Sequence, residues 1–459
     1  MKKIAIIGGG VAGVTTAISL SGLGLSVTLF ERENSLVNGP PFCHLHAGGN
    51  LYREISDTQC IKLLKQSIDF AKLYPFVIDY RPTLIVLPKI DKSTPSMLLD
   101  RLKILKIEYQ RLIDEDISNN ILGDSKDYYK LYTKEKIQNS KDKWILPIRD
   151  NLDLDSVQFP LIMVSEFGLN LFRLASGAKL AIDNLIDISL RLNIEITNIK
   201  RVDSSWSVES KDSIENFDYI INSAGFRTGK IDDMIGIPCK KMVEFKSAYV
   251  SYCESYSNIK FPEIIFHGER GTPNGMGQFT PYSNGHFQLH AMTTDITLYK
   301  NGLVSNSPKS CQPKLDKSFI TKIEKEWDME EVEERTNKAI EHISKFIPKF
   351  KNAKVASKPL FGAQQIVGDD PTLRVAEVSF PAPYYARCEI VKVSSVIDMV
   401  DRILDDLVAS NILDSKNGKI DSLVLKNLKE EDISKYAKVL AKNRNYPKDL
   451  ASLVSKNNL

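Results

Sequence analysis

The chain has 459 residues, 42% of them hydrophobic and 26% charged, with 61 basic and 58 acidic residues and a formal net charge of +3. A chain of this length is too long for a single hydrophobic core, so we expect two or three domains around a shared cleft. The near-neutral charge argues against a dedicated nucleic-acid binder, and six scattered cysteines without zinc-module spacing exclude a small disulfide scaffold and fit a reducing compartment.

The first predicted elements are a strand, a glycine-rich turn and a helix. The apolar residues 4–7 predict a buried parallel strand, residues 8–13 (GGGVAG) form a G-x-G-x-x-G turn, and a helical stretch continues to Leu23. A second strand, residues 26–30, ends at Glu31. A secretory signal also begins with basic and apolar residues, but four glycines interrupt this apolar run. The pattern therefore predicts a dinucleotide-binding unit.

Each part of this unit has a physical task. Gly8 permits the tight turn, Gly10 lets the backbone approach a pyrophosphate, and Gly13 lets the helix pack closely on the strand. The N–H groups at the helix N-terminus suit phosphates, and the acid that ends the second strand suits ribose hydroxyls. The predicted nucleotide-binding residues of this unit are Gly8, Gly10, Val11, Ala12, Gly13, Glu31 and Arg32.

Hydrophobic periodicity and turn residues predict the remaining elements. Helices are predicted at residues 58–74, 97–117, 165–187, 328–350 and 394–410. Strands are predicted at residues 84–87, 194–196, 206–208, 217–225, 244–256, 263–267 and 286–292. The lysine-rich residues 118–143 are predicted to form a surface excursion, and residues 359–378 to bring the chain back to the first domain.

The choice between NAD and FAD depends on what accompanies the fingerprint. A single fingerprint at the start of a long chain favours FAD. Residues 217–225 end in a small-residue turn, which would return the chain to the first sheet and bring Ala224 and Gly225 against the nucleotide. No second fingerprint and no redox cysteine pair near Cys43 is found, which argues against a pyridine-nucleotide disulfide reductase.

The sequence resembles the D-amino-acid-oxidase-like FAD-dependent oxidoreductases, which include sarcosine and glycine oxidases and, more distantly, malate:quinone oxidoreductases. The resemblance is carried by residues 7–13 (IGGGVAG), 30–33 (FERE), 46–49 (HAGG) and 221–225 (INSAG). Members of this group usually close the flavin site with a glycine-rich turn before the last long helix. Here residues 386–392 (ARCEIVK) hold that place, so contacts to the pyrimidine end of the flavin are in doubt.

The fold class that follows is α/β, with a Rossmann-like FAD-binding domain interleaved with an antiparallel-sheet substrate domain, plus a C-terminal helical tail. The predicted bounds are 1–55, 155–240 and 355–410 for the FAD-binding domain, 56–154 and 241–354 for the substrate domain, and 411–459 for the tail. No apolar run is long enough to span a membrane. We expect a cytoplasmic protein, with peripheral membrane contact through the tail left open.

The turn-rich loop at residues 38–50 follows the ribose-binding acid, and in the resembled superfamily this loop passes the isoalloxazine ring. The resemblance therefore implies flavin contacts from His46, Ala47, Gly48 and Gly49. Two sharper alternatives are covalent attachment of the flavin through His44 or His46 and a metal site that includes Cys43. We favour histidines that are hydrogen-bonded beside a noncovalent cofactor, and we predict no metal.

Candidate catalytic residues follow from the chemistry of a carboxylate-bearing substrate. An arginine would bind the carboxylate in a bidentate manner with tyrosine support, which points to Arg270, Tyr385 and Arg387. A histidine is a reasonable base near neutral pH, which points to His290 and His267. His286 lies four residues before His290 in a predicted strand and would share its face.

The predicted function is an FAD-dependent oxidoreductase that oxidises a C–N or C–O bond of a small polar, carboxylate-bearing substrate by hydride transfer to flavin N5. The expected partners are that small molecule and an electron acceptor, oxygen or quinone, and no nucleic acid. The alternatives are an NAD-dependent dehydrogenase and a noncatalytic or tRNA-directed flavoprotein. Substrate identity and oligomeric state stay open.

Overall fold

The computed structural model of the chain describes residues 1–39, 44–47, 49, 55–415 and 423–456. One sheet has six strands in the order β20-β21-β12-β1-β2-β8, and only the edge pair β20–β21 is antiparallel. The strand bounds are β1 (Lys2–Ile7), β2 (Leu25–Phe30), β8 (Ile188–Arg191), β12 (Tyr219–Asn222), β20 (Val378–Ala382) and β21 (Tyr385–Cys388).

The central strand β1 is apolar throughout because it is covered on both faces. Ile4 and Ile6 join the core formed with helices α1 (Val11–Leu20), α6 (Leu171–Asp183) and α10 (Val396–Ala409). Ala5 and Ile7 pack instead towards a three-stranded sheet made of β9 (Ile196–Val202), β10 (Ser205–Ser210) and β11 (Ile214–Phe217). The predicted return strand is confirmed, because β12 lies parallel beside β1.

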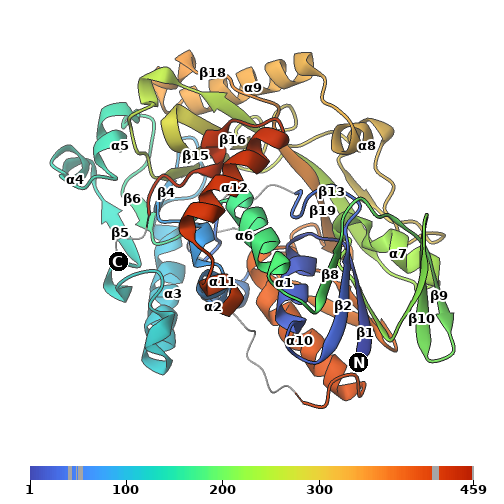
Figure 1. Cartoon of the computed structure of the whole chain (residues 1–459). Coiled ribbons are helices and arrows are strands. Elements are labelled where there is room, and N and C mark those ends of the chain that lie inside the picture. Colours follow the sequence, from blue (N-terminus) through green and yellow to red (C-terminus); the bar gives the residue numbers. More distant parts are fainter. Residues whose placement is uncertain (40–43, 48, 50–54, 416–422, 457–459) are drawn as a thin grey trace.

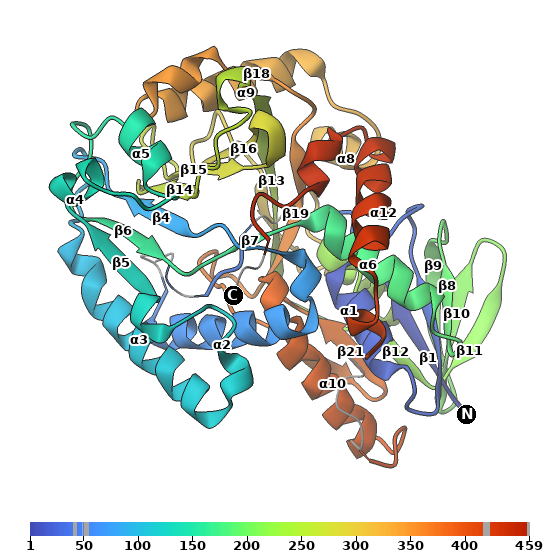
Figure 2. The ribbon, with the colours of Figure 1, turned by 60° about the vertical axis from the view of Figure 1, so that its left-hand side comes forward.

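A larger, ten-stranded sheet forms the second domain (Figure 2). Its strands are β4 (Thr83–Val86), β5 (Tyr129–Tyr132), β6 (Leu161–Val164), β13 (Lys241–Tyr252), β14 (Glu263–Phe266), β15 (Gly277–Pro281), β16 (His286–Ala291), β17 (Leu303–Ser305), β18 (Lys354–Val355) and β19 (Leu360–Val367). The sheet is antiparallel except for the parallel pair β4–β14. It packs against helix α9 (Met329–Ser344), which carries Ile340 and Ile343 into the core of this domain.

The structure differs in detail from four predicted segments. Strand β5 shows that the lysine-rich excursion, residues 118–143, contributes to the large sheet. Strands β6 and β19 also belong to that sheet, although residues 155–240 and 355–410 were assigned to the FAD-binding domain. The predicted helix at 165–187 starts only at Leu171, because the preceding residues pair in a short ladder between β3 (Ile78–Asp79) and β7 (Gly168–Leu169).

The remaining helices cover the two sheets. They are α2 (Asp57–Leu73), α3 (Ser96–Glu115), α4 (Lys134–Gln138), α5 (Leu146–Asn151), α7 (Thr228–Ile235) and α8 (Lys317–Glu324). None of the helices in the described ranges is both long and apolar enough to cross a bilayer.

The C-terminal segment is an integral part of the fold. Helix α11 (Leu423–Lys426) precedes α12 (Glu430–Asn443), and α12 lies alongside α6 (Figure 1). The buried face of α12 consists of Ile433, Ala437, Leu440 and Ala441. The helical tail expected at the C-terminus therefore packs on the nucleotide domain through the apolar face of α12.

Candidate functional site

A cavity of about 380 Å³ lies where strands β1, β2 and β12 end. Its wall contains six of the predicted nucleotide-binding residues: Gly8, Gly10, Glu31, Arg32, Ala224 and Gly225. Val11, Ala12 and Gly13 form the first turn of α1, whose N-terminus directs backbone N–H groups towards this edge of the sheet. In parallel sheets the carboxyl ends of the strands are the usual place for a nucleotide.

The three glycines of the G-x-G-x-x-G turn are needed for different steric reasons. Gly8 has φ +107°, and a Cβ built there would lie 2.5 Å from the carbonyl oxygen of Ser223 at the end of β12. A Cβ on Gly13 would overlap the carbonyl oxygen of Gly8. Gly10 is different, because its Cβ would meet no described atom within 4 Å and would project into the cavity. Gly10 thus leaves room for a pyrophosphate, whereas Gly8 and Gly13 hold the turn.

Glu31 is fixed at the end of β2. One carboxylate oxygen accepts a hydrogen bond from the Gly9 N–H at 2.7 Å, and the other accepts one from the Glu33 N–H at 2.8 Å. Burial raises the pKa of Glu31, while these two backbone donors lower it. The buried carboxylate keeps further lone pairs for ribose hydroxyls. The glycine turn, the open side of Gly10 and this acid together fit the adenosine diphosphate part of FAD.

Four residues of the cavity wall were missed by sequence analysis: Arg227, Lys358, Arg444 and Tyr446. Arg227 follows the predicted Ala224–Gly225 turn closely enough that a wider window would have included it. Lys358 precedes β19, and Arg444 and Tyr446 follow α12. No local motif marks these three residues, because only the tertiary fold brings them to the glycine turn.

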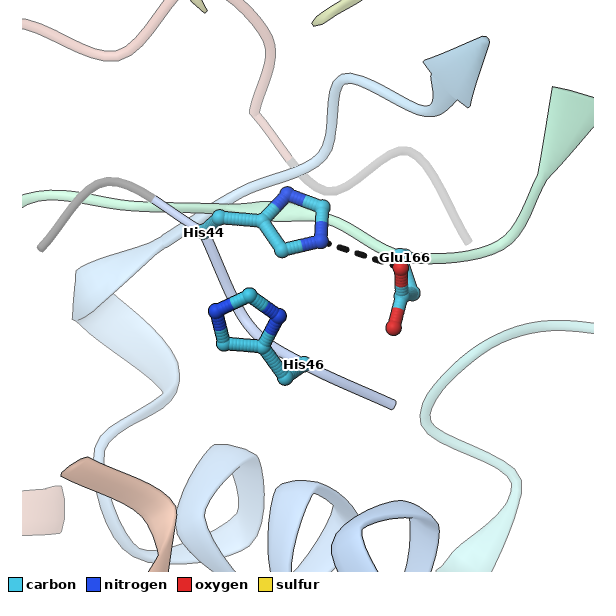
Figure 3. A group of neighbouring side chains, drawn as sticks. All are labelled: His44, His46 and Glu166. Atoms are coloured by element: carbon cyan, nitrogen blue, oxygen red, sulfur yellow. Dashed lines mark hydrogen bonds and ion pairs between the residues drawn. The ribbon is translucent and has the colours of Figure 1, made fainter. Parts of the chain in front are cut away.

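The flavin-loop histidine His44 lies between two buried acids, Glu166 and Glu263, of which Figure 3 shows Glu166. Its Nε2 lies 3.0 Å from Glu166 Oε2, and its Nδ1 lies 3.4 Å from Glu263 Oε2. Burial alone would lower the pKa of His44, but Glu263 and Glu166 outweigh it and raise this pKa to about 9. A protonated imidazole with both nitrogens facing carboxylates is poorly suited to bind a metal or to attach a flavin.

The pKa of His46 is shifted in the opposite direction from that of His44. Its ring lies 4.7 Å from that of His44, and burial, followed by the charge of Lys392, lowers its pKa well below the usual value. A neutral imidazole beside a cofactor is consistent with the favoured interpretation of this loop. His44, His46 and Glu166 also bring one ligand atom each within 4.8 Å of one another, but the protonated His44 opposes a metal there. Cys43 lies outside the described residues.

The predicted backbone contacts of the flavin loop need correction. The Ala47 N–H donates to the Leu45 carbonyl at 3.0 Å, and the Ala47 carbonyl accepts from the Tyr128 hydroxyl at 2.9 Å. The Ala47 backbone is therefore already hydrogen-bonded within the protein. Gly49 is buried against Val164 and Tyr128, and Gly48 lies outside the described residues.

A second polar group lies on the large sheet around His290 of β16. The His290 Nε2 atom is buried and has no hydrogen-bond partner among the described residues. Burial, followed by the charges of Lys246, Arg270 and Lys392, lowers the pKa of His290 to about 3. His290 is thus a neutral imidazole in positively charged surroundings. Arg270 is one of the cations that act electrostatically on His290.

Contacts connect this group to the flavin loop. Glu244 lies 2.8 Å from Lys246 Nζ and pairs with Arg270. Lys246 Nζ donates to the Gln364 side chain at 3.2 Å, and the Gln364 amide donates to the Val391 carbonyl at 2.7 Å. The next residue, Lys392, lowers the pKa of both His46 and His290. Lys392 therefore lies within electrostatic range of both His290 and His46.

Three other catalytic candidates lie elsewhere. His267 is buried beside a separate cavity of about 220 Å³, which His342 also lines. Tyr385 donates its hydroxyl proton to Asp232 at 2.7 Å, and Arg387 pairs with Asp232 at 3.2 Å and with Glu389 at 2.8 Å. Tyr385 and Arg387 belong to strand β21, and their buried network holds β21 and α7 together.

Comparison with known proteins shows what this chain resembles. Residues 3–73 match the family model DAO, FAD dependent oxidoreductase. The chain resembles the DAO-type flavoproteins in sequence and fold. Glycine oxidase from Geobacillus kaustophilus superposes with a TM-score of 0.56 at 10% identity, covering 94% of this chain and 100% of that one. No curated protein sequence matches the chain.

Two further structural neighbours were solved with FAD. The glycerol-3-phosphate dehydrogenase from Bacillus halodurans has a TM-score of 0.58 at 12% identity and covers 98% of this chain and 74% of that one. The L-alpha-glycerophosphate oxidase from Mycoplasma pneumoniae has a TM-score of 0.54 at 16% identity, with 90% and 95% covered. The predicted DAO-like resemblance, the fold class, the FAD cofactor and the assignment as an FAD-dependent oxidoreductase are confirmed.

Glu31→Ala is expected to weaken FAD binding by about 10- to 100-fold, because charge-assisted hydrogen bonds contribute roughly 1.5–3 kcal/mol. Quenching of flavin fluorescence during titration of the apoprotein would measure this affinity. Glu215→Ala is the matched control, since Glu215 lies on β11 and pairs with Arg191. Unchanged FAD affinity in Glu31→Ala would show that the ribose binds elsewhere.

Proposed function

We propose that this protein oxidises a C–N or C–O bond of a small anionic substrate, with FAD as the hydride acceptor and the group around His290 as the substrate site. One observation carries the proposal: His290 Nε2 is buried without a hydrogen-bond partner among the described residues, beside cations. A buried polar atom of this kind costs free energy unless something binds it. A substrate atom is the partner that we propose.

The charge around His290 indicates the kind of substrate. Lys246, Arg270 and Lys392 act on His290, and Arg374 acts on both Lys246 and His46. Among the described groups with the largest effects on this pKa, three are cations that lower it and one, Glu244, is a carboxylate that raises it. Because the cations outnumber the acids, a bound carboxylate or phosphate would be stabilised. Arg270 is suited to a bidentate contact, although it must then share its guanidinium with Glu244.

The residues have distinct roles in this proposal. FAD would supply the acceptor for a hydride when bound. Lys246 and Arg270 bind the anion and so orient the carbon that loses the hydride. His290, which is neutral, takes the proton of the substrate amine or hydroxyl at Nε2. An anion bound beside His290 offsets the nearby cations and raises the pKa of His290 towards the range that a base requires.

The comparisons support a substrate with an anionic group. Glycine oxidase from Geobacillus kaustophilus, L-amino acid deaminase from Proteus vulgaris and L-alpha-glycerophosphate oxidase from Mycoplasma pneumoniae act, by name, on amino acids or on a phosphate ester. The first two substrate types offer a carboxylate and the third a phosphate. Both chemistries fit the cations around His290, so the substrate screen must include both.

Anaerobic reduction of the FAD-loaded protein tests this function directly. Amino acids, 2-hydroxy acids and glycerol 3-phosphate are mixed with the protein, and bleaching of the flavin absorbance band is followed. Amino alcohols and glycerol serve as matched uncharged compounds. We expect one anionic class to bleach the flavin and its uncharged counterpart to fail. Equal reduction by charged and uncharged compounds would contradict the assigned site.

The same preparation tests the alternatives and the electron acceptor. Release of NAD rather than FAD on denaturation would favour the NAD-dependent dehydrogenase, and tight, salt-sensitive binding of tRNA would favour the tRNA-directed flavoprotein. We propose oxygen or a quinone as the acceptor. Reoxidation of the reduced protein by air and by a soluble quinone analogue would distinguish the two.

Lys246→Met is expected to slow flavin reduction by an anionic substrate by about 10- to 100-fold, mainly through weaker substrate binding. His290→Gln is expected to slow it by about 100-fold with a smaller change in the substrate concentration required, because it removes a proton acceptor. Stopped-flow reduction at several substrate concentrations separates the two effects. Lys62→Met, on α2, is the control variant. Wild-type rates in both site variants would exclude the proposed substrate site.

A further inference from the structure

The C-terminal tail places a cation in the nucleotide cavity. Arg444 directly follows α12, and α12 is held on α6 by the Arg173–Glu430 ion pair and by a 2.9 Å hydrogen bond from the Ser176 hydroxyl to the Ile433 carbonyl. Beyond Arg444, the Tyr446 hydroxyl donates to the Pro359 carbonyl at 2.8 Å. The tail is therefore fixed on both sides of Arg444.

The guanidinium of Arg444 binds the segment that supports the glycine turn. It donates to the carbonyl oxygens of Val37 at 3.0 Å and Leu36 at 2.6 Å, and to the Ser35 hydroxyl at 3.1 Å. Val37 in turn donates its N–H to the Gly9 carbonyl at 2.9 Å. Only this one short segment separates Arg444 from the pyrophosphate turn.

These contacts do not account for every hydrogen-bond donor of the Arg444 guanidinium. A guanidinium has five donors, and Arg444 Nε is buried without a hydrogen-bond partner among the described residues. Burial lowers the pKa of Arg444 to about 10, so the group stays charged near neutral pH. In the described part of the chain no carboxylate lies within ion-pair distance of it, and Glu31 acts on it only from farther away. A purely structural role does not account for a buried, uncompensated charge.

We propose that Arg444 binds the diphosphate of the dinucleotide, so that the C-terminal tail is part of the cofactor site. This inference rests on FAD binding in the cavity that Gly8, Gly10 and Glu31 line. The diphosphate brings the negative charge that Arg444 lacks, and the N-terminus of α1 supports the same anion from the opposite side of the turn. Arg444 thereby links the folding of the tail to retention of the cofactor.

Calorimetric titration of the apoprotein with ADP and with FAD tests the proposal. Arg444→Met is expected to weaken both ligands by about 10- to 100-fold. Arg444→Lys keeps the positive charge but lacks the planar guanidinium that donates to two carbonyl groups. It is expected to recover most of the lost ligand affinity. Lys442→Met is the matched control, because Lys442 is an exposed cation on the last turn of α12, and should bind like the wild type.

Thermal unfolding of the apoproteins provides a readout independent of the ligand. If Arg444 only holds the segment 35–37, then Arg444→Lys should bind ADP as poorly as Arg444→Met, and both should unfold at lower temperature. That result, or wild-type ADP affinity in Arg444→Met, would overturn the role of Arg444 alone. A wild-type protein that binds neither ADP nor FAD would overturn the cofactor site and this role with it.

Discussion

Glu263→Gln is expected to lower the free energy of unfolding by about 3–5 kcal/mol, because it removes the acid at the centre of a buried ionic group. Glu263 is fully buried, pairs with Arg81, and lies 3.4 Å from His44 Nδ1. Without its charge, Arg81 would keep Asp79 at 3.6 Å and His44 would keep Glu166 at 3.0 Å among the acids that the structure describes. Urea-induced unfolding at neutral pH measures the loss.

Glu334→Gln makes the same chemical change at the surface. Glu334 pairs with Lys338 one turn along α9, and its side chain is 63% exposed. Such pairs contribute less than about 1 kcal/mol, so this variant should unfold close to the wild type. Equal losses in the two variants would mean that the Glu263 group contributes no more than an exposed pair.

Raising the pH is expected to destabilise the protein through His44. The folded-state pKa of His44 is about 9, against an ordinary value of 6.5. Its contribution to stability is therefore complete below pH 6.5 and is lost as the pH rises through about 9. The difference corresponds to about 3 kcal/mol. The groups that face it are Glu166, Glu263, His46 and Thr83.

Unfolding free energies of the wild type and of His44→Gln, measured from pH 6 to pH 10, isolate this effect. The wild type should be more stable at the acid end, and the difference should shrink as the pH passes 9. A difference that is constant with pH would show that His44 carries the same charge in the folded and unfolded states. Cofactor-free protein should be used, because a bound flavin also changes the charge near this loop.

Sequence analysis located the nucleotide site because its main parts lie in one local unit. Gly8, Gly13 and Glu31 occur within 24 residues, and strand, turn and helix geometry alone bring them to one edge of the sheet. The substrate site proposed around His290 could not be located in this way. Lys246, His290 and Lys392 come from three distant segments, and their meeting depends on how β13, β16 and the segment before α10 pack.

The surroundings of the other catalytic candidates could not be predicted from the sequence for the same reason. Arg387 stands in residues 386–392, where the resembled family closes its flavin site, and Tyr385 directly precedes them. Nothing local shows that both side chains point at Asp232. His267 directly follows β14, and it lines a cavity of which His290 is not part. Periodicity predicts which residues share a strand face, and it does not predict which domain meets that face.

The wall of the nucleotide cavity runs from Ile7 to Tyr446 along the chain. On the ribosome, the nascent glycine turn is complete after a few dozen residues, yet its last supporting arginine is translated more than four hundred residues later. If Arg444 binds the diphosphate as proposed above, full retention of FAD requires a chain that has been synthesised and folded beyond residue 444. A stalled chain that ends before Arg444 would carry the complete fingerprint and still hold its flavin weakly.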